Sequence, residues 1–185
     1  HEVQHGEMLP YFDTFRFEID AMVEQPETTC STWIAAGASR ITIHAESTTR
    51  LPQILREFVT QYGYDKDFAP DLLSLGLALN IESDLALIEP FLESVDYVQF
   101  MGIAHIGRQG EPFDERVLRK IAQFRSRHPK MLLQVDGGVS LATAPALLHA
   151  GVGRLVVGSD IWHAQDPATE ILKFEELAER YGVFK

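Results

Sequence analysis

The sequence lacks most features that mark exported, membrane-bound or nucleic-acid-binding proteins. Cys30 is the only cysteine, which excludes an intrachain disulfide and a cysteine-based metal site. Asp and Glu outnumber Lys and Arg by 27 to 16, and the resulting formal net charge of −11 argues against a nucleic-acid partner. No apolar run reaches the length of a membrane span, and residues 1–6 lack the pattern of a secretory signal. We therefore expect a cytoplasmic protein with no nucleic-acid or membrane partner.

What the sequence does contain is an alternation of two kinds of segment along its 185 residues, with no linker that would divide domains. Short apolar, β-branched runs predict strands at Phe15–Ile19, Arg40–His44, Leu73–Leu79, Tyr97–Met101, Leu132–Val135 and Leu155–Val157. Helical spacing predicts helices at Thr29–Ala36, Thr49–Tyr62, Leu85–Leu92, Asp114–Arg127 and Ala142–Ala150. Because parallel neighbours need a crossover connection, this order predicts one α/β domain, residues 1–185, with a parallel sheet.

The placement of glycine distinguishes a closed barrel from an open, doubly wound sheet. A dinucleotide-binding sheet has its glycine-rich turn after the first strand, whereas here glycines follow the late strands, at positions 107, 110, 137, 138 and 158. Barrels commonly bind phosphate with their last βα loops and a short extra helix. The sequence therefore favours a TIM-type (β/α)8 barrel with phosphate-binding loops in its C-terminal half.

The strand count falls short of such a barrel. Six strands are predicted after Phe15, and residues 1–3 add at most one, whereas a closed barrel needs eight. We therefore expect the first βα unit of the barrel to be lacking. An unpaired parallel edge exposes backbone donors and acceptors, so a homo-oligomer is also expected.

Two strand ends carry the strongest chemical pattern. Val135-Asp136-Gly137-Gly138 is followed, at a helix-length distance, by Val157-Gly158-Ser159. Glycine lets backbone N–H groups approach a phosphate, and a helix N-terminus adds a favourable dipole, so an acidic protein can bind an anion there. The alternative is that these glycines only make tight turns.

A second glycine-bearing loop runs from Met101 to Phe113 and includes Gly107 and Gly110. Its length and composition suit a substrate-closing loop better than a minimal connector. His105 and Arg108 either assist phosphate binding or are ordinary solvated loop residues.

Three polar residues at predicted strand ends are candidates for chemistry. Asp136 lies where barrel enzymes place catalytic groups, and its carboxylate suits a base, an acid, a metal ligand or a helix N-cap. Asp20 is placed similarly. His44 is either a ligand or a buried, satisfied polar residue, whereas Met22 and Met101 are more simply core residues.

The ordered series of motifs resembles the ribulose-phosphate 3-epimerase family from Phe17 to the end of the chain. The matching segments are Met22-Val23-Glu24-Gln25-Pro26, Ala36-Gly37-Ala38, His44-Ala45-Glu46, Gly76-Leu77-Ala78-Leu79-Asn80, Met101 with its loop, Val135-Asp136-Gly137-Gly138 and Val157-Gly158-Ser159. The resemblance implies a ribulose-phosphate-binding barrel with a divalent metal ion. It implies an epimerase of pentose phosphate metabolism that interconverts ribulose 5-phosphate and xylulose 5-phosphate by moving the C3 proton between two carboxylates, one being Asp136. It also implies substrate contacts from residues Gly107, Gly110, Gly137, Gly138, Gly158, Ser159, Met22 and Met101.

The departures from the family pattern fall at its catalytic centre. Placing Gly6 and Pro10 in register puts Glu2 at the position of the second catalytic Asp, and Asp20 stands where the family has a metal-binding His. The resemblance thus implies a metal set of Glu2, Asp20 and Asp136 for one divalent ion, Mn, Mg, Fe or Zn, and the oxygen ligands suit Mn²⁺ or Mg²⁺ better than zinc. Two alternatives remain: a binding barrel that has lost catalysis, or another phosphosugar isomerase or epimerase.

Overall fold

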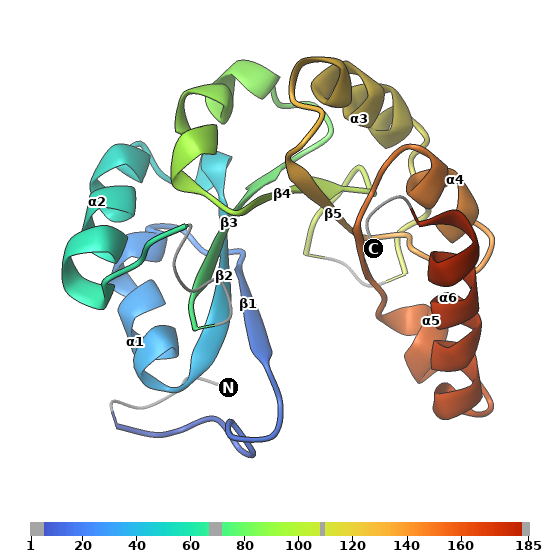
Figure 1. Cartoon of the computed structure of the whole chain (residues 1–185), viewed down its shortest axis with the longest axis horizontal. Coiled ribbons are helices and arrows are strands. Elements are labelled where there is room, and N and C mark those ends of the chain that lie inside the picture. Colours follow the sequence, from blue (N-terminus) through green and yellow to red (C-terminus); the bar gives the residue numbers. More distant parts are fainter. Residues whose placement is uncertain (1–5, 67–71, 108–109, 183–185) are drawn as a thin grey trace. The chain divides into compact units, whose positions relative to one another are not determined.

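The fold of the chain is given by a computed structural model that describes residues 6–66, 72–107 and 110–182. Its strands form a sheet in the order β1-β2-β3-β4-β5-β6, and the registered pairs β1–β2, β2–β3 and β5–β6 are parallel. Strands alternate with helices along the chain (Figure 1). The predicted α/β class with a parallel sheet is therefore confirmed. Within the described residues, no helix is long and apolar enough to cross a membrane.

The chain divides into two compact units. The N-terminal unit comprises His1–Ala78 and Asp84–Tyr97, and the C-terminal unit comprises Leu79–Ser83 and Val98–Lys185. The first contains β1 (Phe17–Ala21), α1 (Cys30–Ala35), β2 (Ala38–His44), α2 (Leu51–Tyr62), most of β3 (Ser74–Leu79) and four 3-10 turns. The turns are η1 (Pro26–Thr28), η2 (Ala45–Ser47), η3 (Leu85–Leu87) and η4 (Glu89–Ser94). Helices α1 and α2 lie along one side of these strands (Figure 1).

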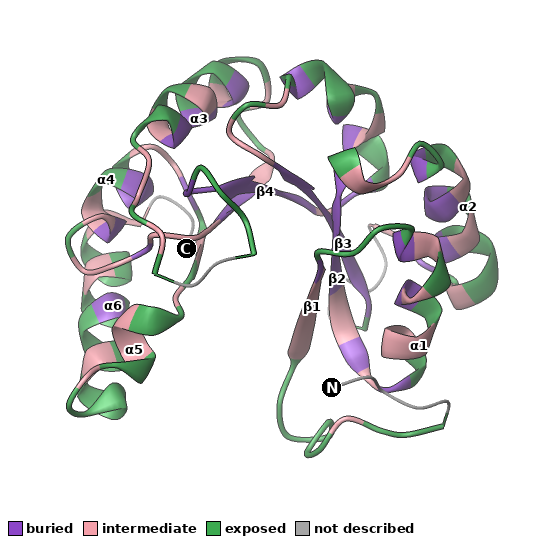
Figure 2. Cartoon of the chain, turned by 180° about the vertical axis from the view of Figure 1, so that it is seen from behind, coloured by how far each residue is buried: buried purple, intermediate pink, exposed green. Residues whose placement is uncertain are grey.

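Packing in the N-terminal unit explains why β3 contains a glycine. β3 is buried along its whole length (Figure 2). A Cβ at Gly76 would lie 2.2 Å from the ring of Tyr97, so the ring occupies the space that any other side chain would need. The Tyr97 hydroxyl lies 2.7 Å from Thr42 Oγ1 and donates to Glu18 at 3.4 Å. The apolar core of this unit therefore encloses a hydrogen-bonded polar group at its centre.

The C-terminal unit continues the alternation. It contains most of β4 (Tyr97–Met101), α3 (Arg116–Arg127), β5 (Leu132–Asp136), α4 (Ala144–His149), β6 (Arg154–Val156), α5 (Ser159–Trp162) and α6 (Pro167–Tyr181). Val117, Ile121 and Phe124 bury one face of α3, following the spacing of an amphipathic helix. Helix α6 packs against both α4 and α5.

Two cations on α3 hold loops through backbone carbonyls. Lys120 Nζ donates to the carbonyl oxygens of Asn80, Ile81 and Ser83, which follow β3. The Arg125 guanidinium donates to Pro129 and Met131 at 2.9 and 2.7 Å and to Gly151 at 2.6 Å. Burial lowers the pKa of Arg125. These bonds satisfy carbonyl groups outside the regular elements, so loops on either side of β5 are fixed to one helix.

The structure corrects two element predictions and adds two helices that were not predicted. The strand predicted at Phe15–Ile19 runs over Phe17–Ala21, because the Phe15 N–H closes a turn with the Tyr11 carbonyl instead. The helix predicted at Leu85–Leu92 is two 3-10 turns, η3 and η4, and Pro90 at the start of η4 lacks the N–H that an α-helix would use. Helices α5 and α6 were missed, although the Asp166-Pro167 pair is a recognisable helix start. The strand considered at residues 1–3 lies outside the described residues.

Candidate functional site

The candidate site of the C-terminal unit lies where β4 and β5 end. Asp136 is the last residue of β5 and is partly exposed. Its carbonyl oxygen accepts a hydrogen bond of 2.7 Å from the N–H of Gly102, the residue that follows β4. The backbone that carries Asp136 is thereby fixed to the neighbouring strand, while its side chain stands at the carboxyl end of the sheet. Barrel enzymes place catalytic groups at this end.

The paired glycines after Asp136 bring two loops into close contact. Gly137 and Gly138 have φ angles of 95° and 65°, a region that other residues rarely adopt. A Cβ on Gly137 would lie 2.8 Å from Ile103, and one on Gly138 would lie 2.7 Å from Cα of Phe113. Both glycines are therefore needed for the close packing of these two loops, in addition to the accessible backbone N–H groups that the sequence predicts. The backbone also approaches closely at Gly102, where an added Cβ would lie 2.2 Å from the Gly137 carbonyl oxygen.

The other predicted phosphate-binding glycines face open space. A Cβ on Gly107, Gly110 or Gly158 would meet no atom within 4 Å. Gly107 and Gly110 have φ angles of 82° and 78°, and Gly158 directly precedes Ser159, which begins α5. Access to these backbone segments is therefore not blocked by packing.

A side-chain hydrogen bond joins the loop after β5 to the loop after β6. Asp160 Oδ2 accepts from the N–H of Leu141 at 3.0 Å, and Thr143 Oγ1 donates to the Gly138 carbonyl at 3.0 Å. In the parallel register of the two strands, Asp136 pairs with Val156. The structure thus brings together the Gly137–Gly138 segment and the Gly158–Ser159 segment. The linking residue Asp160 was not identified from the sequence, because nothing in its neighbourhood distinguishes it from a solvated first-turn acid.

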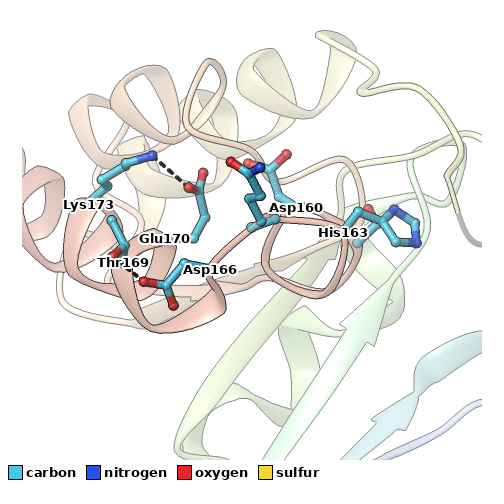
Figure 3. Close-up of a pocket in the computed structure, with 9 residues that line it drawn as sticks. Asp160, His163, Asp166, Thr169, Glu170 and Lys173 are labelled. Atoms are coloured by element: carbon cyan, nitrogen blue, oxygen red, sulfur yellow. Dashed lines mark hydrogen bonds and ion pairs between the residues drawn. The ribbon is translucent and has the colours of Figure 1, made fainter.

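Next to Ser159 lies a polar surface hollow of about 490 Å³ (Figure 3). Asp160, Asp166, Glu170 and Lys173 contribute its charges, and Lys173 Nζ lies 2.8 Å from Glu170. A hydrogen bond from Thr169 lowers the pKa of the Asp166 carboxyl, and the hydrogen bond with Glu170 raises the pKa of Lys173. Acidic side chains outnumber the single lysine, so the hollow carries a net negative charge. Ser159 itself lines this hollow, and the surrounding acidic side chains disfavour an anion on that side of α5.

In the N-terminal unit, Asp20 and His44 form a close pair at the carboxyl ends of β1 and β2. His44 Nε2 lies 3.1 Å from Asp20 Oδ1, and the two side chains are 3% and 21% exposed. Beyond them, Glu27 lies 3.4 Å from Arg50 Nη1 beside a second hollow of about 450 Å³. Met22 follows β1 and is 40% exposed, so its interpretation as a core residue is wrong, and its predicted contact with substrate stays a prediction. The Asp20–His44 distance fits a contact between the two side chains, but neither atom makes a hydrogen bond of acceptable geometry, so His44 is a buried residue beside Asp20 rather than a satisfied one.

The predicted site residues are divided between the two units. Asp136, Met101 and the glycines with Ser159 belong to the C-terminal unit, whereas Asp20 and Met22 belong to the N-terminal unit. Glu2 lies outside the described residues, as does Arg108. His105 Nδ1 lies 3.3 Å from Glu111 and is largely exposed. Among the described residues, no group of three or more His, Cys, Asp or Glu side chains is arranged to hold a metal ion. The metal set Glu2, Asp20 and Asp136 therefore stays a prediction.

Sequence reasoning also overlooked two buried glutamines below this site. Gln99 and Gln134 are each 1% exposed, and Gln134 Nε2 donates to Gln99 Oε1 at 2.8 Å. Strand alternation places them on the faces that carry Met101 and Asp136, two residues further along. A polar side chain repeated two residues before a candidate site residue is the pattern that would have revealed them.

Comparison with known proteins identifies the family. The sequence model of the Ribulose-phosphate 3 epimerase family matches residues 3–162. The ribulose-phosphate 3-epimerase of Schizosaccharomyces pombe is 31% identical over 151 residues, which are 82% of this chain and 61% of that protein. The Aquifex aeolicus enzyme is 30% identical over 165 residues, which are 86% of this chain and 69% of that protein. The chain thus spans less than two thirds of the length of the yeast relative.

Solved structures support the fold. A 3-hexulose-6-phosphate synthase from Salmonella typhimurium superposes with a TM-score of 0.70 at 20% identity, covering 92% of this chain and 76% of that one. KGPDC from Streptococcus mutans gives a TM-score of 0.67 at 17% identity, covering 92% and 74%. Identities this low show the fold alone, which is the parallel α/β fold that the chain shares with these two proteins. The family match over residues 3–162 and the motif order agree, and the chain therefore belongs to the ribulose-phosphate 3-epimerase family.

Proposed function

We propose that the protein is an epimerase of ketopentose 5-phosphates that interconverts ribulose 5-phosphate and xylulose 5-phosphate. The observation that carries this proposal is the arrangement at the end of β5. A carboxylate, Asp136, directly precedes two glycines of positive φ, and their loop is hydrogen-bonded to the loop that carries Gly158 and Ser159. A proton-transfer group and backbone donors for an anion therefore lie within one small part of the C-terminal unit.

In this reaction Asp136 would exchange a proton with C3 of the ketose. Removal of the C3 proton by a carboxylate leaves an enediolate, and return of a proton to the opposite face gives the epimer, with no net oxidation or reduction. One carboxylate is needed on each face. Asp136 supplies one, and we assign the other to Glu2 on the strength of the family resemblance. Met101, at the end of β4, would pack against the sugar, as would Met22.

The phosphate group would be bound by backbone N–H groups of Gly107, Gly110, Gly137, Gly138, Gly158 and Ser159. A protein of net charge −11 needs such local donors, because its overall field repels anions. Positive φ angles at four of these glycines turn the peptide groups as compact anion-binding loops require. The open space around Gly107, Gly110 and Gly158 leaves room for a ligand.

The family resemblance implies one divalent metal ion, and we propose Mn²⁺ or Mg²⁺ ahead of iron or zinc. The described residues do not by themselves build the site, since they provide no group of three metal-binding side chains and Asp20 contacts His44. No step above is therefore assigned to a metal. Elemental analysis of protein purified without chelator should show less than one zinc per chain, and stoichiometric tightly bound zinc would contradict the oxygen-ligand set.

Isotope exchange tests the proposed activity. In deuterated water the protein should exchange the C3 proton of ribulose 5-phosphate, and Asp136→Asn should lower that rate by a factor of about 10² to 10⁴, the usual contribution of a general acid or base. Calorimetry should show tighter binding of ribulose 5-phosphate than of inorganic phosphate, and no binding of free ribulose. Full activity of Asp136→Asn would remove this residue from the mechanism.

A phosphosugar-binding protein without epimerase activity is the second candidate. The observation that favours it is the pairing of Asp20 with buried His44, which engages one of the three carboxylates predicted to bind metal. Such a protein would bind ribulose 5-phosphate in calorimetry without any C3 exchange. Another isomerase or epimerase reaction on the same phosphate-binding loops would instead appear as exchange with a different phosphorylated ketose.

We also propose that the protein self-associates. Strand β1 stands at one end of the strand order, and an edge strand offers unpaired backbone groups to a second chain. Tyr11 and Phe15, which precede β1, are exposed and stack edge to face on each other. Light scattering should report a mass above that of one chain, and a stable monomer at all concentrations would contradict the proposal.

A further inference from the structure

Two buried glutamines and a methionine form a directed chain of hydrogen bonds at the end of β4. Gln134 Nε2 donates to Gln99 Oε1 at 2.8 Å, and Gln99 Nε2 donates to Met101 Sδ at 3.5 Å. All three residues are 1% exposed. The chain starts on β5, crosses to β4 and ends on the methionine that we place in the substrate site.

The orientation of the Gln99 amide follows from the chemistry of its neighbours. A thioether sulfur accepts hydrogen bonds and donates none. If the amide were turned over, its carbonyl oxygen would face the sulfur, and its NH₂ group would face the NH₂ group of Gln134. The observed orientation pairs the Gln99 NH₂ group with the sulfur and the Gln99 carbonyl oxygen with the Gln134 NH₂ group.

Stability does not require this polar pair. Replacing both partners of a buried hydrogen bond by apolar groups of similar shape is often nearly neutral. The amides do provide direction. Methionine has three rotatable side-chain bonds and adapts to irregular gaps, so a donor fixed on its sulfur restricts the positions of its methyl group.

The end of the chain lies beside the proposed acid–base residue. Met101 is followed by Gly102, whose N–H is bonded to the Asp136 carbonyl oxygen, and Asp136 itself comes two residues after Gln134 on the same face of β5. Both glutamines thus lie one layer below the residues that would hold the sugar. We propose that Gln99, oriented by Gln134, is a positioning residue that fixes the Met101 side chain against the substrate next to Asp136. This inference rests on the proposed function, in which Met101 lines the substrate site.

Methionine-methyl NMR tests the inference without reference to activity. The chain has four methionines, and the Met101 resonance is identified by its loss in Met101→Leu. In Gln99→Leu the Met101 methyl resonance should shift and broaden, while those of Met8, Met22 and Met131 stay in place. In Gln134→Leu the Met101 resonance should move in the same direction by less. The Gln99 NH₂ group still faces the Met101 sulfur in this variant, but its carbonyl oxygen has lost the hydrogen bond from Gln134.

The double variant Gln99→Leu/Gln134→Leu separates positioning from folding. Each single variant leaves one amide without its partner and should melt at a lower temperature, whereas the double variant should regain much of the loss. Its Met101 resonance should nevertheless remain shifted. In C3 exchange, Gln99→Leu and the double variant should lower kcat about two- to tenfold, the effect of one lost hydrogen bond, with unchanged affinity for inorganic phosphate.

The outcomes distinguish this inference from the proposed function. A Met101 resonance that is unmoved in Gln99→Leu overturns the positioning role, whatever the activity. An exchange rate that recovers together with melting temperature in the double variant also overturns it, since the glutamines would then act through stability alone. A wild-type protein that exchanges no C3 proton overturns the proposed function instead and leaves the Met101 measurement as the test of the contact itself.

Discussion

The two units differ in the contacts that are made at the carboxyl ends of their strands. In the C-terminal unit, Gly102, Gly137 and Gly138 let two loops approach through backbone atoms beside Asp136, and the exposed His105 pairs with Glu111 in the loop after β4. In the N-terminal unit, side-chain pairs occupy the same ends: Asp20 with His44, and Glu27 with Arg50. Under the proposed function, the difference would let an acidic chain bind an anion in one unit by backbone groups, while charged side chains pair with one another in the other unit.

Substitution of Gly138 should have the largest effect, on both the free energy of unfolding and the affinity for phosphate. In Gly138→Ala a methyl group at a φ of 65° would meet Phe113 Cα at 2.7 Å. Backbone strain and overpacking should together lower the free energy of unfolding by about 3 kcal/mol. Affinity for inorganic phosphate should fall by about tenfold or more as backbone donors move. Urea unfolding and calorimetry measure the two effects.

Gly63→Ala is the matched control. Gly63 ends α2 with a φ of 63°, but a Cβ there would meet no atom within 4 Å. It should cost only the strain, about 1 kcal/mol, with phosphate affinity unchanged. Equal losses of phosphate affinity in the two variants would show that the Gly138 loop is not the anion site.

Gly76→Ala provides the corresponding test in the N-terminal unit. The new methyl would lie 2.2 Å from the Tyr97 ring, which is fully buried and hydrogen-bonded through its hydroxyl to Thr42. Overpacking should lower the free energy of unfolding by about 1 to 3 kcal/mol. In the folded fraction, phosphate affinity should equal that of the wild type. A loss of phosphate affinity at full folding would break the proposed separation of roles.

The Asp20–His44 pair should show a smaller, measurable coupling. Asp20→Asn and His44→Gln each remove one partner of a largely buried contact, and the double variant removes both. A double-mutant cycle in urea should give a coupling of about 1 kcal/mol. Strictly additive effects would mean that the two side chains are neighbours without a stabilising interaction. Phosphate calorimetry on the same variants should show no change.

The smallest expected effect concerns Cys30, whose reactivity shows whether the N-terminal unit is folded. Burial raises the pKa of its thiol to about 12, so at pH 8 the native protein holds a neutral, inaccessible thiol. A thiol-specific disulfide reagent should react with one group per unfolded chain and with almost none in the native state. Because the folded-state pKa is raised, the contribution of Cys30 to stability is complete below the unfolded value of 9.0 and is lost as pH rises beyond it. Rapid native labelling at pH 8 would contradict this burial.

The sequence predicted those parts of the fold that depend on local patterns. All six strands were found because runs such as Leu73–Leu79 are apolar over the full length of a buried strand. The helix predicted at Leu85–Leu92 was wrong because Asp84 and Pro90 favour tighter turns at that point. Helix α6 was missed because only Phe174 among its residues is buried, which leaves its apolar periodicity weak.

Candidate site residues could be proposed from the sequence where a position after a strand limits the roles of a residue, whereas contacts between distant residues could not. Asp136 and the glycines stood out because their positions after a strand limit what they do. The dual use of Gly137 and Gly138 in packing depends on Ile103 and Phe113, which lie in the loop after the preceding strand, so no local pattern carries it. The Gln99–Gln134 bond joins two strands in the same way. Pairings across strands follow from the tertiary register, which periodicity does not specify.

The Arg125 clamp has a consequence for how the C-terminal unit opens to solvent. One guanidinium holds carbonyls just before β5 and at the turn that precedes β6, where Gly153 and Val152 donate amide hydrogens to Leu133 and Leu147. Releasing either segment alone would leave part of a partly buried cation with fewer acceptors. Local fluctuations are therefore suppressed in favour of a larger cooperative opening. The amides around Gly151 and Met131 should exchange hydrogen for deuterium at one common slow rate, as parts of a single foldon.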